Sequence, residues 1–105
     1  MRRNLQLLII FLFKSAASAA SISGYLTDGE TGEPLPYANI YLDGLPVGTS
    51  TNDKGYYIME GVPEGENRLI ATYLGYRDYV RLINVKAGDH IRMDMEMTPS
   101  AEVGA

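Results

Sequence analysis

The chain has 105 residues, with 9 basic and 13 acidic side chains, a net charge of −4, and no cysteine. An acidic chain repels nucleic-acid phosphates, so we expect no nucleic-acid partner. The lack of cysteine excludes a disulfide framework and a thiol nucleophile. The length suits one small domain whose stability must come from packing.

The N-terminus has the features of a secretory signal. Residues 2–3 are basic, residues 5–13 are mainly apolar, and residues 17–19 are small, as a signal peptidase requires. An apolar stretch of this length falls well short of the roughly 20 residues that span a bilayer. We therefore expect residues 1–20 to be a signal peptide. The mature chain would then reach the periplasm or the periplasmic face of the outer membrane, with secretion as the alternative.

The remainder of the chain predicts an all-β domain. Apolar residues recur at a spacing of two, glycine and proline mark frequent turns, and no long amphipathic helix is indicated. Seven short strands without a helix require two packed sheets. The predicted strands span residues 22–27, 38–42, 49–51, 56–59, 68–74, 79–85 and 91–97.

The connections follow from turn chemistry. Pro34 and Pro36 cannot donate ladder hydrogen bonds, so they predict an extended connector before the second strand. Residues 52–55 predict a hairpin turn, and residues 61–65 another. The strand at 68–74 carries apolar residues on both faces, which predicts that it is buried. Residues 21–98 form the expected domain, and residues 99–105 a polar tail or linker.

Four segments carry a family pattern in chain order. Residues 22–28 supply an opening strand and turn, and residues 31–40 read Thr-Gly-x-Pro-Leu-Pro-x-Ala-x-Ile. Residues 48–57 read Gly-Thr-x-Thr-x-x-x-Gly-x-aromatic, and residues 75–76 are Gly-Tyr. This set resembles the carboxypeptidase regulatory-like (transthyretin-like, peptidase-associated) family, in the version found at the N-terminus of SusC-like TonB-dependent outer-membrane receptors. The resemblance implies a seven-stranded Greek-key β-sandwich of the prealbumin type.

The resemblance also implies a function. A module placed directly after an export signal is expected to be a non-catalytic, periplasm-facing accessory domain of a TonB-dependent receptor, present as an N-terminal fragment or a split copy. Its partner would be a receptor barrel or another envelope protein, reached by strand addition at an exposed sheet edge. Two alternatives stay open. One is a free-standing secreted module that binds a glycan or an envelope protein, and the other is a support domain for a peptidase encoded nearby.

Few residues offer catalytic chemistry. His90 is the only histidine, whereas a peptidase zinc site normally needs two histidines and a carboxylate. The acid pairs Glu64–Glu66 and Asp94–Glu96 are predicted in a turn and on a solvent face, without the cleft that a glycosidase needs. We therefore expect no enzyme activity, no catalytic residue, no metal site and no cofactor.

Tyrosine is the remaining conspicuous residue type, with eight copies. The side chains of Tyr25, Tyr37 and Tyr41 are predicted to point away from the core, because they alternate with core residues. An exposed tyrosine face can stack on sugar rings or grip a protein. Tyrosine also has a high β-propensity and often simply covers a sheet. These three residues are the candidate interaction surface.

Overall fold

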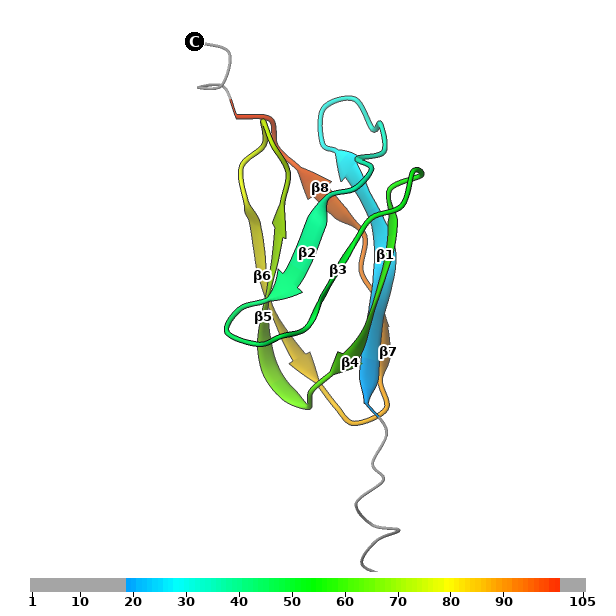
Figure 1. Cartoon of the computed structure of the whole chain (residues 1–105), viewed down its shortest axis with the longest axis vertical. Helices are drawn as coiled ribbons and strands as arrows, with labels where there is room; N and C mark the ends of the chain where they lie inside the picture. Colours follow the sequence, from blue (N-terminus) through cyan, green and yellow to red (C-terminus); the bar gives the residue numbers. More distant parts are fainter. Residues whose placement is uncertain (1–18, 101–105) are drawn as a thin grey trace, which may run out of the picture.

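A computed structural model describes residues 19–100, and the predictions for residues 1–18 and 101–105 lie outside the described residues. Within residues 19–100 all regular secondary structure is β. Figure 1 shows two layers of strands, with β1 beginning at one pole and the described chain ending at the other. The strands are β1 (Ala20–Asp28), β2 (Asn39–Leu42), β3 (Gly48–Ser50), β4 (Tyr56–Val62), β5 (Gly65–Thr72), β6 (Tyr79–Val85), β7 (His90–Arg92) and β8 (Met95–Met97).

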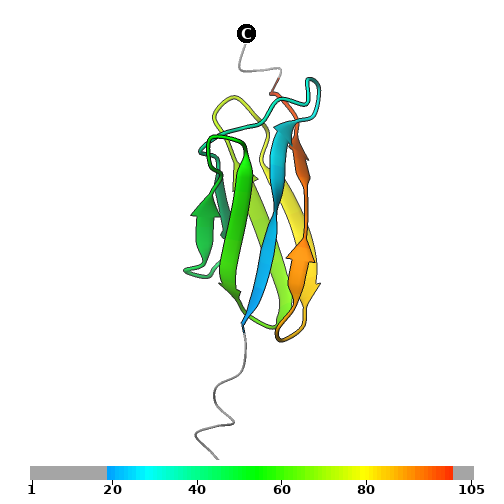
Figure 2. The same ribbon diagram turned by 90° about the vertical axis from the view of Figure 1, so that its right-hand side faces the viewer.

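The first sheet is built around β1. This strand pairs antiparallel with β4 and parallel with β7 and β8. Figure 2 shows β1 in blue between β4 on one side and the two short C-terminal strands on the other. Because β7 and β8 both pair with β1, they act as one interrupted strand at the edge of the sheet.

That interruption explains why the structure has eight strands where the sequence predicts seven. The backbone of Gly24 lies so close to the carbonyl oxygen of Met93 that no side chain fits at position 24. The Met93 N–H donates to the Ser23 carbonyl oxygen at 2.8 Å. The predicted alternation persists through the irregularity, because Met93, Met95 and Met97 are all buried.

The second sheet has the strand order β3-β2-β5-β6. On its inner face, Ile40 lies opposite Ala71, and both are buried. On its outer face, Tyr41 lies opposite Ile70, which in turn lies opposite Val80. Strand β6 ends the sheet and therefore presents an edge.

The core lies between the two sheets and confirms the prediction of an all-β sandwich. Strands β1 and β8 of the first sheet and β2 and β5 of the second all contribute residues to this one cluster. Its fully buried larger side chains are Ile22, Leu26, Ile40, Leu42, Tyr57, Met59, Val62, Leu69, Val85, Met95 and Met97.

Several boundaries differ from the expected ones. Ala20 is the first residue of β1 and is buried, so the sandwich begins one residue before the expected start at 21. Strand β4 runs to Val62 and β5 starts at Gly65, which shortens the predicted turn at 61–65. At the other end, Pro99 pairs with Tyr76, so the start of the expected tail lies against the β5–β6 hairpin.

The prediction that Leu74 belongs to a buried strand is wrong. Strand β5 ends at Thr72. Leu74 lies in the hairpin loop and is 97% exposed. The backbone leaves the sheet here because Gly75 adopts a φ of 92°, which a glycine accepts without a steric penalty.

Candidate functional site

The three candidate tyrosines are all exposed, but they do not form one surface. Tyr25 lies on β1 and faces outward from the first sheet, whereas Tyr41 lies on β2 and faces outward from the second. Tyr37 lies in the connector that enters β2. The fold therefore brings Tyr37 and Tyr41 to one side of the sandwich and places Tyr25 on the opposite side.

Tyr25 is engaged by its own neighbours. Its ring meets the Tyr56 ring edge-on with the centroids 5.1 Å apart, and the Arg92 guanidinium lies 5.6 Å from its centroid. Asp94 accepts a hydrogen bond from the Tyr25 N–H at 2.9 Å and another from Arg92 Nε at 3.0 Å. These two donors, the Tyr25 N–H first, lower the pKa of Asp94. This cluster stabilises the sheet surface and gives the Tyr25 ring partners within the chain, while 43% of the residue stays exposed.

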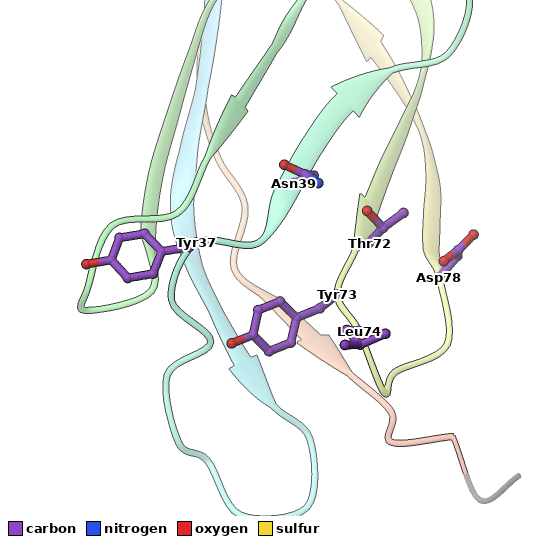
Figure 3. Close-up of a pocket in the computed structure, with 6 residues that line it drawn as sticks. All are labelled: Tyr37, Asn39, Thr72, Tyr73, Leu74 and Asp78. Atoms are coloured by element: carbon purple, nitrogen blue, oxygen red, sulfur yellow. The ribbon is translucent and has the colours of Figure 1, made fainter. Parts of the chain in front are cut away.

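A hollow of about 420 Å³ opens on the other side, at the end of the second sheet. Its volume falls within the range of small-ligand sites, about 300–1,000 Å³. Figure 3 shows the Tyr73 ring between Tyr37 and Leu74, with polar side chains from β2, from β5 and from the residue before β6 along the other border. The lining residues are Tyr37, Asn39, Thr72, Tyr73, Leu74 and Asp78.

Tyr37 is held in an unfavourable backbone conformation. Its φ is 61°, and among residues 19–100 it is the only non-glycine residue with a positive φ. The left-handed region costs a bulky residue on the order of 1–2 kcal/mol. The turn persists because buried Thr51 fixes both of its sides. The Thr51 hydroxyl donates to the Leu35 carbonyl oxygen at 2.6 Å and accepts from the Ala38 N–H at 2.8 Å. The result is a ring that is not packed into the core and is 69% exposed.

Tyr73 packs against Tyr76, which is itself held by a hydrogen bond. Its ring lies 5.5 Å from the ring of Tyr76, measured between centroids. The Tyr76 hydroxyl donates to Asp28 Oδ2 at 2.6 Å, while Asp28 Oδ1 accepts from the Glu30 and Thr31 N–H groups at 2.7 and 3.0 Å. These contacts hold the aromatic wall of the hollow in place.

The same contacts shift two ionisation equilibria. Hydrogen bonds from Tyr76, then from the Glu30 and Thr31 N–H groups, lower the pKa of Asp28. Donation to the Asp28 carboxylate, followed by burial, raises the pKa of Tyr76 to about 12. Asp28 is therefore ionised and Tyr76 neutral at any ordinary pH, which preserves the hydrogen bond that supports Tyr73.

The lining of the hollow is aromatic and hydrogen-bonding rather than catalytic. Asn39 offers an amide, Thr72 a hydroxyl and Asp78 a carboxylate, and the hydrogen bonds within residues 19–100 do not use these side chains. No lysine, arginine or histidine lines it. Such a set can bind a ligand that combines an apolar face with hydroxyl groups, but it lacks a nucleophile paired with a base.

The part of the chain that the structure describes contains no group of three or more His, Cys, Asp or Glu side chains placed to hold a metal ion. His90 begins β7, is exposed, and lies 2.8 Å through Nδ1 from the Ser21 hydroxyl. Among residues 19–100 there is also no helix of the length and hydropathy needed to cross a membrane.

Sequence reasoning found Tyr37 but missed the rest of the hollow. Tyr73 and Leu74 read as the end of a buried strand, and Asn39, Thr72 and Asp78 are ordinary polar positions beside strand ends. The available signal was Gly75, since a glycine that interrupts an apolar run can mark the loop where the strand has ended.

The family segments meet in space, and the first and the last are joined by a hydrogen bond. Asp28 closes the opening strand and Tyr76 belongs to the Gly-Tyr pair, and they bind one another. The chain matches the model of the CarboxypepD_reg-like domain family over residues 22–103 and belongs to that family. The family comprises non-catalytic β-sandwich domains. A search of curated proteins found no match.

Solved structures confirm the fold at low sequence identity. A chain of a mutant type II cohesin–X-dockerin complex from Acetivibrio cellulolyticus matches with a TM-score of 0.60 and 18% identity, over 72% of this chain and 52% of that one. Catechol 1,2-dioxygenase from Acinetobacter radioresistens gives 0.60 and 13%, over 88% and 55%. A putative membrane-associated protein from Bacteroides fragilis gives 0.58 and 17%, over 82% and 30%. The chain thus spans about half the length of the first two and less of the third.

Proposed function

We propose that this chain is a periplasm-facing accessory domain of a TonB-dependent, SusC-like outer-membrane receptor, as an N-terminal fragment or split copy. It works by binding a neighbouring envelope protein rather than by catalysis. Three observations support this proposal: the family membership, the secretory pattern of the N-terminus, and an exposed sheet edge suited to docking.

The edge strand β6 carries the proposal. It pairs with β5 on one side through seven residue pairs and ends the sheet on the other. Val80 and Leu82 project from its outer face, and Leu82 is 60% exposed. Apolar side chains on an unprotected edge are a liability in a solitary domain, because such an edge recruits other strands.

Strand addition gives this edge a role. An extended segment of the receptor or of a partner protein can continue the sheet beyond β6 with main-chain hydrogen bonds, while Val80 and Leu82 supply apolar contacts. In Figure 1 strand β6 runs along the side of the module, from the pole where the described chain ends toward the opposite pole.

The first test is the size and location of the protein that carries the domain. An antibody against the domain should detect a large protein in the outer-membrane fraction, and the gene downstream should encode a plug and a barrel of alternating strands of about ten residues. A free protein of about 9 kDa without such a downstream region would contradict the proposal.

The docking edge can be tested separately, because the chain has no cysteine of its own. Leu82→Cys places a thiol on β6, and Ile58→Cys places a matched one on the outer face of β4, where Ile58 is 49% exposed. In intact envelopes a maleimide reagent should label the thiol at 58 and spare the thiol at 82. Equal labelling of both positions would overturn the docking mode.

A second candidate function is favoured by the hollow. A free-standing secreted module that binds a glycan would need an aromatic surface with hydrogen-bonding groups beside it. The residues that line the hollow supply both. The antibody experiment separates the two candidates, because only the free-standing module requires a small, freely diffusing protein.

A further inference from the structure

We propose that the hollow between the Tyr37 turn and the β5–β6 hairpin binds a neutral oligosaccharide, with one sugar unit in the hollow against Tyr73 and the next over the Tyr37 ring. This inference rests on the domain being a binding module, the premise of both candidate functions, and does not depend on whether the domain is attached to a receptor.

The chemistry of the lining favours a sugar. The C–H face of a pyranose packs on an aromatic ring, and its hydroxyl groups need side chains that both donate and accept hydrogen bonds. Tyr73 supplies the ring, Asn39 and Thr72 supply both kinds of group, and Asp78 supplies a strong acceptor. The hollow contains no cationic side chain, so an anionic sugar would lack a counter-charge and a neutral one is expected.

The strained turn is the second argument. A tyrosine at positive φ persists only where the surrounding structure imposes it, and such strain clusters at binding sites. Thr51 imposes it here, through hydrogen bonds on both sides of Tyr37. Glycine would relieve the strain, yet the position holds an exposed aromatic ring. The cost is understandable if the ring itself contacts a ligand.

The placement of the two rings sets the size of the ligand. In Figure 3 the Tyr73 ring lies at the border of the hollow, whereas the Tyr37 ring extends outward from it. A single sugar in the hollow would pack on Tyr73 and meet Tyr37 only at the border. A chain that leaves the hollow over the Tyr37 side would contact both, so binding should strengthen with chain length.

Both walls are held in place before any ligand arrives. Tyr76 and Asp28 support Tyr73, and Thr51 supports the Tyr37 turn. A preformed site loses little conformational entropy on binding, which matters for a weak ligand such as a sugar.

The test is an NMR titration of the chain, expressed from its full coding sequence and labelled with ¹⁵N, using glucose, maltotetraose and cellotetraose as probes. At least one tetrasaccharide should shift the backbone amide signals of Asn39, Tyr73 and Asp78. Tyr37→Gly should weaken that tetrasaccharide about tenfold, as the loss of an aromatic anchor does. It should weaken glucose by a smaller factor, because a single sugar in the hollow contacts mainly Tyr73.

Matched variants make the outcome decisive. Tyr37→Phe retains the ring and should bind the tetrasaccharide like the unchanged chain, and so should Tyr25→Ala, which alters the opposite sheet. Asn39→Ala should weaken the binding of glucose and of that tetrasaccharide. The proposal is overturned if no probe shifts these signals, if Tyr37→Gly binds the tetrasaccharide normally, or if tetramethylammonium binds in the hollow in place of the sugars. A receptor-sized band on the immunoblot with no sugar binding would refute this inference alone.

Discussion

The two outer faces of the sandwich both display tyrosine, but they use it differently. On the first sheet, the Tyr25 ring contacts Tyr56 and Arg92, and its N–H donates to Asp94. On the second, Tyr37 extends from a strained turn beside a hollow, and the turn is fixed by hydrogen bonds of the Thr51 hydroxyl and not by the Tyr37 ring. Exposure is similar in kind at the two positions. What separates them is whether the ring already has partners within the chain.

The same contrast divides the family segments from the hollow. Gly24, Asp28, Thr51 and Tyr76 are each used internally, to allow a close backbone approach or to complete a hydrogen bond. Most residues that line the hollow lie outside the family segments. Tyr37 and Asn39, in the segment at residues 31–40, are the exceptions. The recurrent pattern of the family therefore specifies the fold, and the candidate binding residues lie around it.

The largest effect on stability is expected from Gly24→Ala, in the first sheet, where β1 lies against the interruption between β7 and β8. The added methyl group would overlap the carbonyl oxygen of Met93, a backbone atom that cannot move without disturbing β7 and β8. We expect a loss of about 3 kcal/mol in the free energy of unfolding, measured by urea denaturation. Ser23→Ala, one residue away, should cost far less, and equal losses would contradict this account of the interrupted strand.

Thr51→Val should have the next largest effect. Valine has nearly the same shape, but it removes the hydroxyl that serves the Leu35 carbonyl and the Ala38 N–H. Two buried backbone groups without partners should cost about 2 kcal/mol. Thr51→Ser retains the hydroxyl and should lose much less. If valine and serine prove equally tolerated, the turn at Tyr37 is held by something other than this residue.

Tyr57→Phe tests a buried hydroxyl of the first sheet. The Tyr57 hydroxyl donates to the Met93 carbonyl oxygen at 2.6 Å, so phenylalanine, the more usual residue here in the family pattern, should cost about 1 kcal/mol. Thermal unfolding at neutral pH measures this difference. A variant as stable as the unchanged chain would mean that the bond merely replaces one to water.

Tyr57 also predicts a pH dependence. Burial raises the pKa of Tyr57 above its ordinary value of 10.0. The unfolded chain then releases the phenolic proton at lower pH than the folded chain, so the stability that this residue contributes is complete below pH 10 and is lost as the pH rises above it. Tyr57→Phe should reduce this alkaline loss. An unchanged slope would contradict the assignment.

The sequence predicted what alternation and turn chemistry determine. The strand at 79–85 was predicted with the bounds it has, and the Met93 to Met97 alternation correctly identified core positions. The irregularity at Met93 was not predictable, because it results from a contact with Gly24 some 70 residues away in sequence. Leu74 is wrongly predicted as buried because hydrophobicity does not reveal where a strand ends, whereas Tyr73 does pack against the core. Alternation also cannot tell on which of two sheets an outward tyrosine lies.

The measurement that tests the contrast most directly is the stability of Tyr37→Gly beside that of Tyr25→Gly, by urea denaturation at neutral pH. Tyr25→Gly should lose about 1 kcal/mol, since glycine weakens a strand interior and the cross-strand pair with Tyr56 disappears. Tyr37→Gly should lose nothing and can gain up to about 1 kcal/mol, because it relieves the positive φ. If Tyr37→Gly is destabilised as much as Tyr25→Gly, the Tyr37 ring serves the fold and is not held out for a ligand.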